Sequence, residues 1–494
     1  MNPNLLDPAV RAELIESFRS TGNKQRKDAA YKRYRIFKDN LHKYVRDYLL
    51  TQFDESTVKS MPIVSSINIC KRVITQEASI YMSDPERVVG EGDETDGAVI
   101  LQALKDAKLN SKMKKANEYF KLNKGQSVLQ VILKDKKVQV RVLLPHQFDV
   151  VVDSEDSEKP YAYFVCTTGA REKKSQERYT VWSDSFNFIC DGDGLIVGDS
   201  SKVLNPIRKM PFVDISVDKD SEFYVEAGEC DGDFTIQYNA ALSDLWNICR
   251  LQGYAQAVYI GDPESMPAII TMGPNRVLRI PVNPDKDGQT EFKYVTPTPD
   301  IEGVIKQIEQ LLANFLTTRG IDTKAIQGTL SSNTGYSSGV ERLLAMIDRF
   351  EATRDDFSVF ESAEGEVFEL TKLWLTTYTN TEYLSEKYKI SGAAKDLTMS
   401  VSYSKPESIK TDDERNKDLE WRMKVGVADA VTVLMERYGM TEDQALAALK
   451  KIYERKKIID AMKPKPDQEE EQDPNNPNQK DVNNGDKGSE ANAS

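Results

Sequence analysis

The sequence predicts an α+β protein in which strands gather in one stretch and helices lie before and after it. Three observations support this fold class. Amphipathic helical patterns cover residues 8–19, 24–50 and 64–82. Alternating apolar residues then appear in QSVLQVIL, VQVRVLL, YAYFVCTT, RYTVWS and SFNFIC, between residues 126 and 190. Helical patterns return at residues 234–258, 299–318, 339–379 and 412–457.

Length and composition limit the classes of protein that fit. A chain of 494 residues is too long for one ordinary core, so several domains are expected. The formal net charge of −13 argues against affinity for nucleic acid along the whole chain. No apolar run approaches the roughly 20 residues that span a bilayer. The start, MNPNLLDPAV, lacks the order of a signal peptide, so we expect a cytosol-like location.

The five cysteines are scattered without a CxxC pair. They predict buried thiols rather than a disulfide framework or a zinc site. The turn-rich DGDG at residues 191–194 lacks the other ligands of a calcium loop, so it predicts a hairpin turn.

The stretch GYSSG, residues 335–339, matches the G-x-S-x-G pattern of hydrolases. A nucleophilic serine there would need a preceding strand and a later histidine. Neither is present, because TKAIQGTLSSNT is not a strand and both histidines, His42 and His146, come earlier. Ser338 with Glu341 instead predicts a capping box at the start of the next helix. No Walker lysine follows. We therefore expect no catalytic residue, no cofactor and no metal site.

The helix predicted at 24–50 has a basic face, which leaves two interpretations. The face is a surface for nucleic acid or another acidic partner, or it is a solvated face that balances acidic neighbours. Nine cations make up this face: Lys24, Arg26, Lys27, Lys32, Arg33, Arg35, Lys38, Lys43 and Arg46.

The second half of the chain predicts two helices that flank a small island rich in Pro and Gly. The island, residues 260–298, contains the short strand patterns PAIITM, NRVLRIPV and EFKYVT. The helix after it carries one apolar stripe: Ile301, Val304, Ile305, Ile308, Leu311, Leu312 and Phe315. A polar loop of about residues 320–337 follows, and then a long helix with a possible kink at Gly365. LTMSVSY predicts a strand, and the composition beyond residue 463 predicts disorder.

This order of elements resembles the portal proteins of tailed bacteriophages over residues 30–460. The stretches that carry the resemblance are SINICKRVITQEASIYMSDP, LLPHQFDVVVD, NPIRKMPFVDIS, the helix–island–helix of 234–318 and SSGVERLL. Two departures are Ser83, where the family often has Gly, and VGVADAV, which lacks the usual Ser after the glycine.

The resemblance implies a division of the chain into named parts. They are N-terminal helices and an α/β wing (1–233), a first stem helix (234–259), a small α/β clip (260–298), a second stem helix (299–319), a tunnel loop (320–338), a long wing helix with a strand (339–411), a helical crown (412–462) and a disordered acidic tail (463–494).

In function, the resemblance implies a structural ring of usually twelve identical subunits at one capsid vertex, made in the host cytoplasm and kept in the virion. Such rings pass double-stranded DNA during packaging and ejection. They meet the major capsid and scaffolding proteins, the terminase large subunit and a head-completion adaptor, and no membrane. DNA would touch the tunnel loop at Lys324, Gln327, Ser331, Ser332, Asn333 and Tyr336. Partners would dock on the clip at Met266, Pro274, Asn275, Arg276, Lys286 and Lys293.

Three alternatives belong beside this interpretation. One is another head–tail connector or minor capsid ring protein, although most adaptors are much smaller. Another is a DNA-binding protein that uses the basic face of residues 24–46, which a steep salt dependence of binding would support. The third is a hydrolase or nucleotide-driven enzyme, which the missing motifs argue against.

Overall fold

The structure is a computed structural model, and its architecture is α+β, as predicted. It describes residues 2–90, 94–167, 176–198, 203–217, 219, 222–225, 231–252, 256–261, 278–281, 291–295, 300–321, 347–391, 394, 396–403, 412–426, 428–438 and 442–462. The chain divides into two compact units, Met1–Ile409 and Lys410–Ser494. Within the described ranges, no helix has the length and apolar character needed to cross a membrane.

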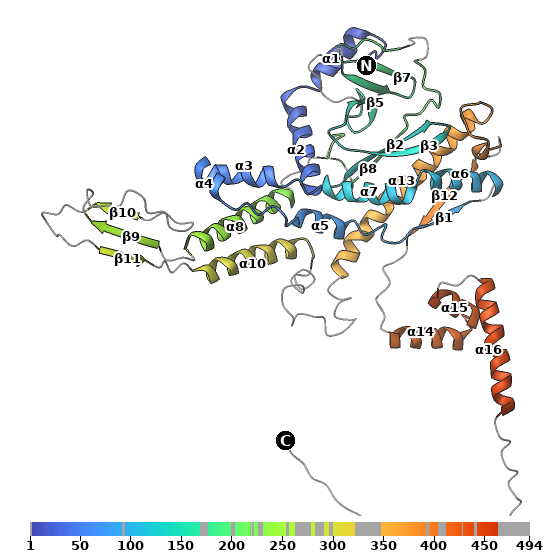
Figure 1. Cartoon of the computed structure of the whole chain (residues 1–494). Helices are drawn as coiled ribbons and strands as arrows, with labels where there is room; N and C mark the ends of the chain where they lie inside the picture. The colour runs from blue at the N-terminus through green and yellow to red at the C-terminus, as the bar shows by residue number, and fades with distance from the viewer. Residues whose placement is uncertain are drawn as a thin grey trace, which may run out of the picture. The chain divides into compact units, whose positions relative to one another are not determined.

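Helices supply more residues to the first unit than strands do (Figure 1). They are α1 (Pro8–Ser17), α2 (Thr21–Phe37), α3 (His42–Gln52), α4 (Glu55–Ser60), α5 (Ile69–Glu77), α6 (Glu94–Asp106), α7 (Leu109–Leu122), α8 (Asp231–Gln252), α10 (Ile301–Thr318), α13 (Ile347–Tyr378) and the 3₁₀ helix η3 (Glu386–Tyr388). The second unit contains α14 (Asp412–Val425), α15 (Ala430–Tyr438) and α16 (Glu442–Met462).

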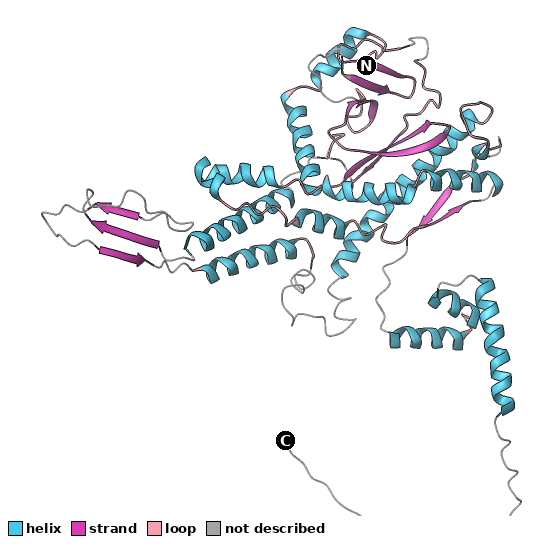
Figure 2. Cartoon of the chain, viewed as in Figure 1, coloured by secondary structure: helices cyan, strands magenta, loops and turns pink. Residues whose placement is uncertain are grey.

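The strands that the structure describes form four small sheets (Figure 2). Their bounds are β1 (Glu86–Val89), β2 (Gln126–Lys134), β3 (Lys137–Leu143), β4 (Phe148–Val152), β5 (Pro160–Cys166), β6 (Arg178–Trp182), β7 (Asn187–Asp191), β8 (Phe212–Ser216), β9 (Gln256–Gly261), β10 (Leu278–Pro281), β11 (Glu291–Val295) and β12 (Met399–Ser402). The strand orders are β1-β12, β10-β9-β11, β3-β2-β8 and β4-β5-β6-β7.

The hairpin predicted around Lys134–Lys137 is confirmed. β2 and β3 pair antiparallel from Val128↔Leu143 to Lys134↔Lys137. The two turn residues, Asp135 and Lys136, both have positive φ, at 53° and 61°. This left-handed pair is what a two-residue hairpin turn needs to match the twist of its strands.

The main core lies where helices cover the β3-β2-β8 sheet. α7 packs on β2 and β3, and α13 packs on β2 and β8. The sheet and α13 are also joined by a hydrogen bond, which Trp374 Nε1 donates to Val131 O at 2.8 Å. This core therefore links the long helix to strand β2, more than 200 residues earlier in the chain.

Three predicted helices are shorter or broken in the structure. The helix predicted at residues 234–258 ends at Gln252, and residues 256–261 form strand β9 instead. Residues 24–50 form two helices, α2 and α3, because the chain turns at Asp39, whose φ is 62°. Asn68 donates to Asp39 Oδ1 at 2.9 Å and so fixes that turn from a distant segment. Residues 64–82 form a helix only at Ile69–Glu77. The predictions of one helix over residues 24–50 and of one over residues 64–82 were therefore wrong.

Other predictions have mixed outcomes. The strands of 160–190, the DGDG turn, the helix at 299–318, β10, β11 and β12 are confirmed. The strand pattern PAIITM, residues 339–346 and the tail from 463 lie outside the described residues. Cys70 and Cys190 are buried as expected, but Cys249 is exposed.

Candidate functional site

Most residues predicted to meet DNA or partners lie outside the described residues. This holds for Lys324, Gln327, Ser331, Ser332, Asn333 and Tyr336 and for Met266, Pro274, Asn275, Arg276 and Lys286. The predicted capping box, Ser338 with Glu341, also lies outside the described residues. Lys293 is described as part of β11, where it pairs with Val258 of β9. The described surface nearest to these segments in sequence is the helix pair of α8 and α10, which enters and leaves the β10-β9-β11 sheet.

The α8–α10 pair is antiparallel and packs through stacked aromatic rings. Phe234, near the start of α8, stacks on Phe315, near the end of α10, with ring centroids 3.9 Å apart. Phe234 and Phe315 pack against a small core that contains Val73 of α5 and Leu316 of α10. This contact joins the base of the helix pair to the body.

A row of buried polar residues on α8 anchors the pair to an extended segment of the chain. Thr235 Oγ1 accepts a hydrogen bond from Cys70 N, and Ser243 Oγ accepts one from Val64 N, both at 2.8 Å. Between them, Asn239 donates to Ile67 O at 2.7 Å and accepts from Ile67 N at 3.4 Å. These side chains are four residues apart, so they share one face of the helix.

This polar row explains why residues 62–68 are not helical. The backbone N–H of Val64 and both backbone polar groups of Ile67 bond to α8 instead of to a neighbouring helical turn. Sequence reasoning missed the row, although polar residues at positions 235, 239 and 243 of an otherwise apolar face were a visible signal.

A cluster of charges closes the base of the helix pair. Asp231 is 2% exposed, accepts a hydrogen bond from Arg319 Nη2 and lies 3.5 Å from Lys124 Nζ. Burial raises the pKa of the neighbouring Glu77, and the charge of Asp231 raises it further, while Arg319 opposes the shift. The first residue of α8 is thus tied to the residue that follows α10.

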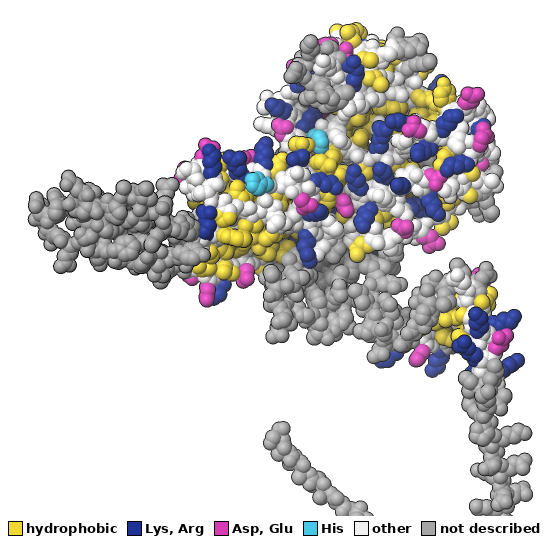
Figure 3. Space-filling view, in the orientation of Figure 1, with side chains coloured by type: hydrophobic (Ala, Val, Ile, Leu, Met, Phe, Trp, Pro, Cys, Tyr) yellow, Lys and Arg dark blue, Asp and Glu magenta, His cyan; other side chains and the backbone are white. Residues whose placement is uncertain are grey.

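The outer faces of the helix pair remain apolar and uncovered. Trp246 on α8 is 61% exposed and Leu311 on α10 is 58% exposed. Ile308 and Leu316, in contrast, are buried. The predicted stripe of α10 is therefore wider than its contact with α8. Figure 3 shows hydrophobic side chains gathered along both helices. Exposed apolar area of this kind marks surfaces that bind another protein.

The basic face predicted for α2 is partly used inside the protein. Arg26 and Lys27 both reach Asp149, which is 3% exposed, at 3.0 and 2.6 Å. Lys32 pairs with Asp233 at 2.7 Å. These three cations balance acidic neighbours, which favours the second interpretation of this face for them.

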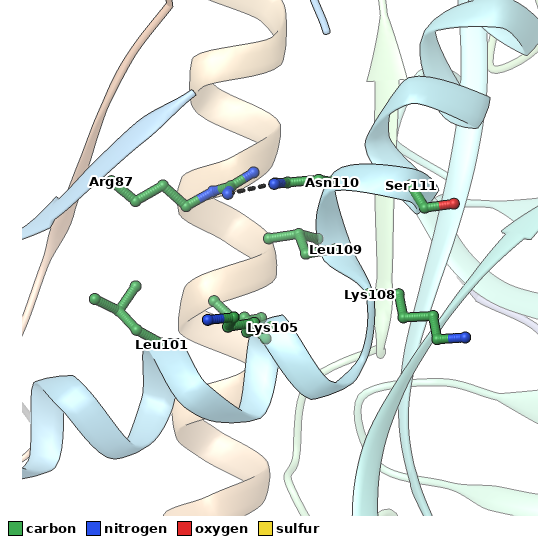
Figure 4. Close-up of a pocket in the computed structure, with 8 residues that line it drawn as sticks. Arg87, Leu101, Lys105, Lys108, Leu109, Asn110 and Ser111 are labelled. Atoms are coloured by element: carbon green, nitrogen blue, oxygen red, sulfur yellow. Dashed lines mark hydrogen bonds between the residues drawn. The ribbon is translucent and has the colours of Figure 1, made fainter. Parts of the chain in front are cut away.

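A cavity of about 420 Å³ lies where α6 and α7 meet. Figure 4 shows Arg87 of β1 reaching Asn110 at the start of α7, at 2.6 Å. The same guanidinium makes two hydrogen bonds to Glu364 of α13, at 2.5 and 2.9 Å, and Glu364 is 0% exposed. Arg87 thus holds three elements together. Lys105 and Lys108 also line this cavity, and its described lining includes no histidine or cysteine.

Among the described residues, no group of three or more His, Cys, Asp or Glu is placed to hold a metal ion. No protein-family model matches this sequence, and comparison with curated proteins gives no match.

Proposed function

We propose that this chain is the subunit of a portal ring at one vertex of a phage capsid. The observation that supports it most is the antiparallel α8–α10 pair, which leads into a small sheet and carries uncovered apolar side chains. In the proposal, α8 and α10 are the stem, the β10-β9-β11 sheet belongs to the clip, and residues 320–338 are the tunnel loop.

A ring gives these apolar faces a partner. In a head-to-tail contact, two different faces of the same subunit meet, and such contacts close into a ring when the rotation allows. Trp246 and Leu311 lie on different helices, so each could meet a neighbouring copy. Burial of each side chain would contribute about 1.5–3 kcal/mol.

The acidic chain fits a channel for DNA. Each phosphate contact adds salt-dependent affinity, so a channel through which DNA slides should hold few strong contacts. The proposed partners are the major capsid and scaffolding proteins, the terminase large subunit, a head-completion adaptor and DNA in transit.

Deletion of residues 328–335 tests the tunnel-loop part of the proposal in an infection assay. The expected result is normal assembly of empty heads with impaired DNA packaging or retention, because the polar loop contacts passing DNA. Normal numbers of DNA-filled heads would refute the role of the loop. Native mass spectrometry of the purified protein tests the ring itself, with a mass near twelve chains expected and a monomer or dimer at every concentration opposing it.

A further inference from the structure

A second cavity, of about 660 Å³, opens between two sheets of the body. Gln130 of β2 and Arg141 of β3 line one wall, and Trp182 of β6 and Ile189 of β7 line the other. Trp374, near the end of α13, closes one side. Figure 3 shows hydrophobic side chains gathered between the four-stranded sheet and the β2–β3 hairpin. We call this cavity the aromatic cleft. Its volume is in the range of ligand sites.

Gln130 lines the cleft, and no residue of the described chain forms a hydrogen bond with its side-chain amide. The residue is 4% exposed. Gln126, on the same strand, differs because its amide donates to Asp214 Oδ1 at 3.1 Å and to Phe223 O at 2.9 Å. The amide of Gln130 is therefore available to bond to an occupant of the cleft.

Aromatic rings give the cleft a fixed apolar surface. Trp182 and Trp374 meet edge to face with centroids 6.4 Å apart, and Trp374 stacks on Tyr378 at 5.9 Å. Trp374 Nε1 is already bonded to the backbone of β2. Trp182 Nε1 is buried and has no partner among the described residues. At the mouth, Tyr383 is 71% exposed. This surface suits a large apolar side chain.

The mouth of the cleft is positively charged. Lys134, Lys136 and Arg141 are exposed, and none forms an ion pair within the part of the chain that the structure describes. Among the described residues that line the cleft, Asp135 is the one acidic residue. Arg141 lies directly across from Gln130 in the β2–β3 register. An occupant of the cleft should therefore carry a carboxylate near its apolar group.

We propose that the aromatic cleft binds an extended peptide segment of a partner protein, in which a large apolar side chain lies beside an acidic one. From Gln130 to Lys134 the wall runs four residue steps along β2, about 13 Å, which is the length of about four residues of an extended peptide. A glutamine amide both donates and accepts, so it can pair with a peptide group of the ligand. This proposal does not depend on the portal assignment.

The test begins with a display library of random linear peptides, selected on the full-length protein. The expected consensus has an aromatic or branched apolar residue with Asp or Glu close to it. A synthetic, fluorescein-labelled copy of the strongest peptide is then titrated by anisotropy. Arg141→Glu and Tyr383→Ala should each weaken its binding by about tenfold or more. Lys43→Glu and Tyr453→Ala change equally exposed residues outside the cleft and should leave binding unchanged.

A photoreactive benzoylphenylalanine in place of the apolar peptide residue locates the site on the unmodified protein. It should attach to β2, β6 or the end of α13. The proposal is overturned if no peptide is enriched, if the enriched peptides are basic or purely polar, if both cleft variants bind as tightly as the wild type, or if the label attaches elsewhere.

Discussion

Replacement of Asn239 by Ala tests whether α8 holds the extended segment of residues 62–68. Asn239 is 0% exposed and makes two hydrogen bonds to the backbone of Ile67. A buried group that loses its partner costs about 1–3 kcal/mol. Ile67 is 41% exposed, so water reaches part of its backbone and the lower figure applies to each bond. The expected loss of local stability is about 2 kcal/mol.

Hydrogen exchange followed by mass spectrometry measures this loss in the segment itself. A loss of about 2 kcal/mol should speed exchange in residues 62–68 by about 30-fold. Thr317→Ala is the matched control, because its exposed hydroxyl donates only to Ala313 O of its own helix. Unchanged exchange in residues 62–68 would refute the anchoring role of α8. An equal increase in every peptide would show that Asn239 stabilises the whole unit instead.

Three further predictions concern charge and the helix pair. Burial raises the pKa of Glu77, so its protonated form favours the folded state; the stability it contributes is present below about pH 4.5 and is lost as pH rises through the raised pKa. Glu77→Gln should remove this loss of stability. The urea concentration at the unfolding midpoint should then change less with pH in the variant than in the wild type. Glu364→Gln should lower the free energy of unfolding by about 3–5 kcal/mol, because it leaves the cation of Arg87 without its buried partner. Replacement of both Glu364 and Arg87 by Met should restore most of the lost stability in the same urea assay. Leu311→Asp should change the stability of the single chain by no more than about 0.5 kcal/mol but should abolish ring assembly, measured by size-exclusion chromatography with light scattering. Asn314→Asp is the control, because it puts the same charge at another exposed site of α10, and this variant should still assemble.

Local chemistry was enough to predict elements that depend on neighbouring residues. The β2–β3 hairpin follows from alternating apolar residues on either side of a polar turn, and α10 follows from its apolar stripe. In both, the residues that decide the structure lie within a few positions of each other.

Elements fixed by distant partners could not be predicted in this way. Residues 64–68 belong to a predicted helix, but Asn239 and Ser243, more than 170 residues away, bond to their backbone and keep them out of a helix. The break at Asp39 likewise depends on Asn68. The aromatic cleft also needs the fold, because Gln130 and Trp374 come together only when α13 packs on β2.

The candidate functional residues show the same limit. Ser, Asn and Lys in the 320–338 segment have no chemical pattern that specifies DNA, so their predicted role came from resemblance alone. The uncovered apolar faces of α8 and α10 became visible only once the structure separated the buried part of the stripe from the rest.

Electron microscopy of the purified full-length protein, sorted for end-on views, tests the central claim most directly. The portal proposal predicts closed rings of about twelve copies with an axial hole, in which α8 and α10 form subunit contacts. A two-fold dimer that buries Trp246 and Leu311 would contradict the proposal, as would a monodisperse monomer at every concentration.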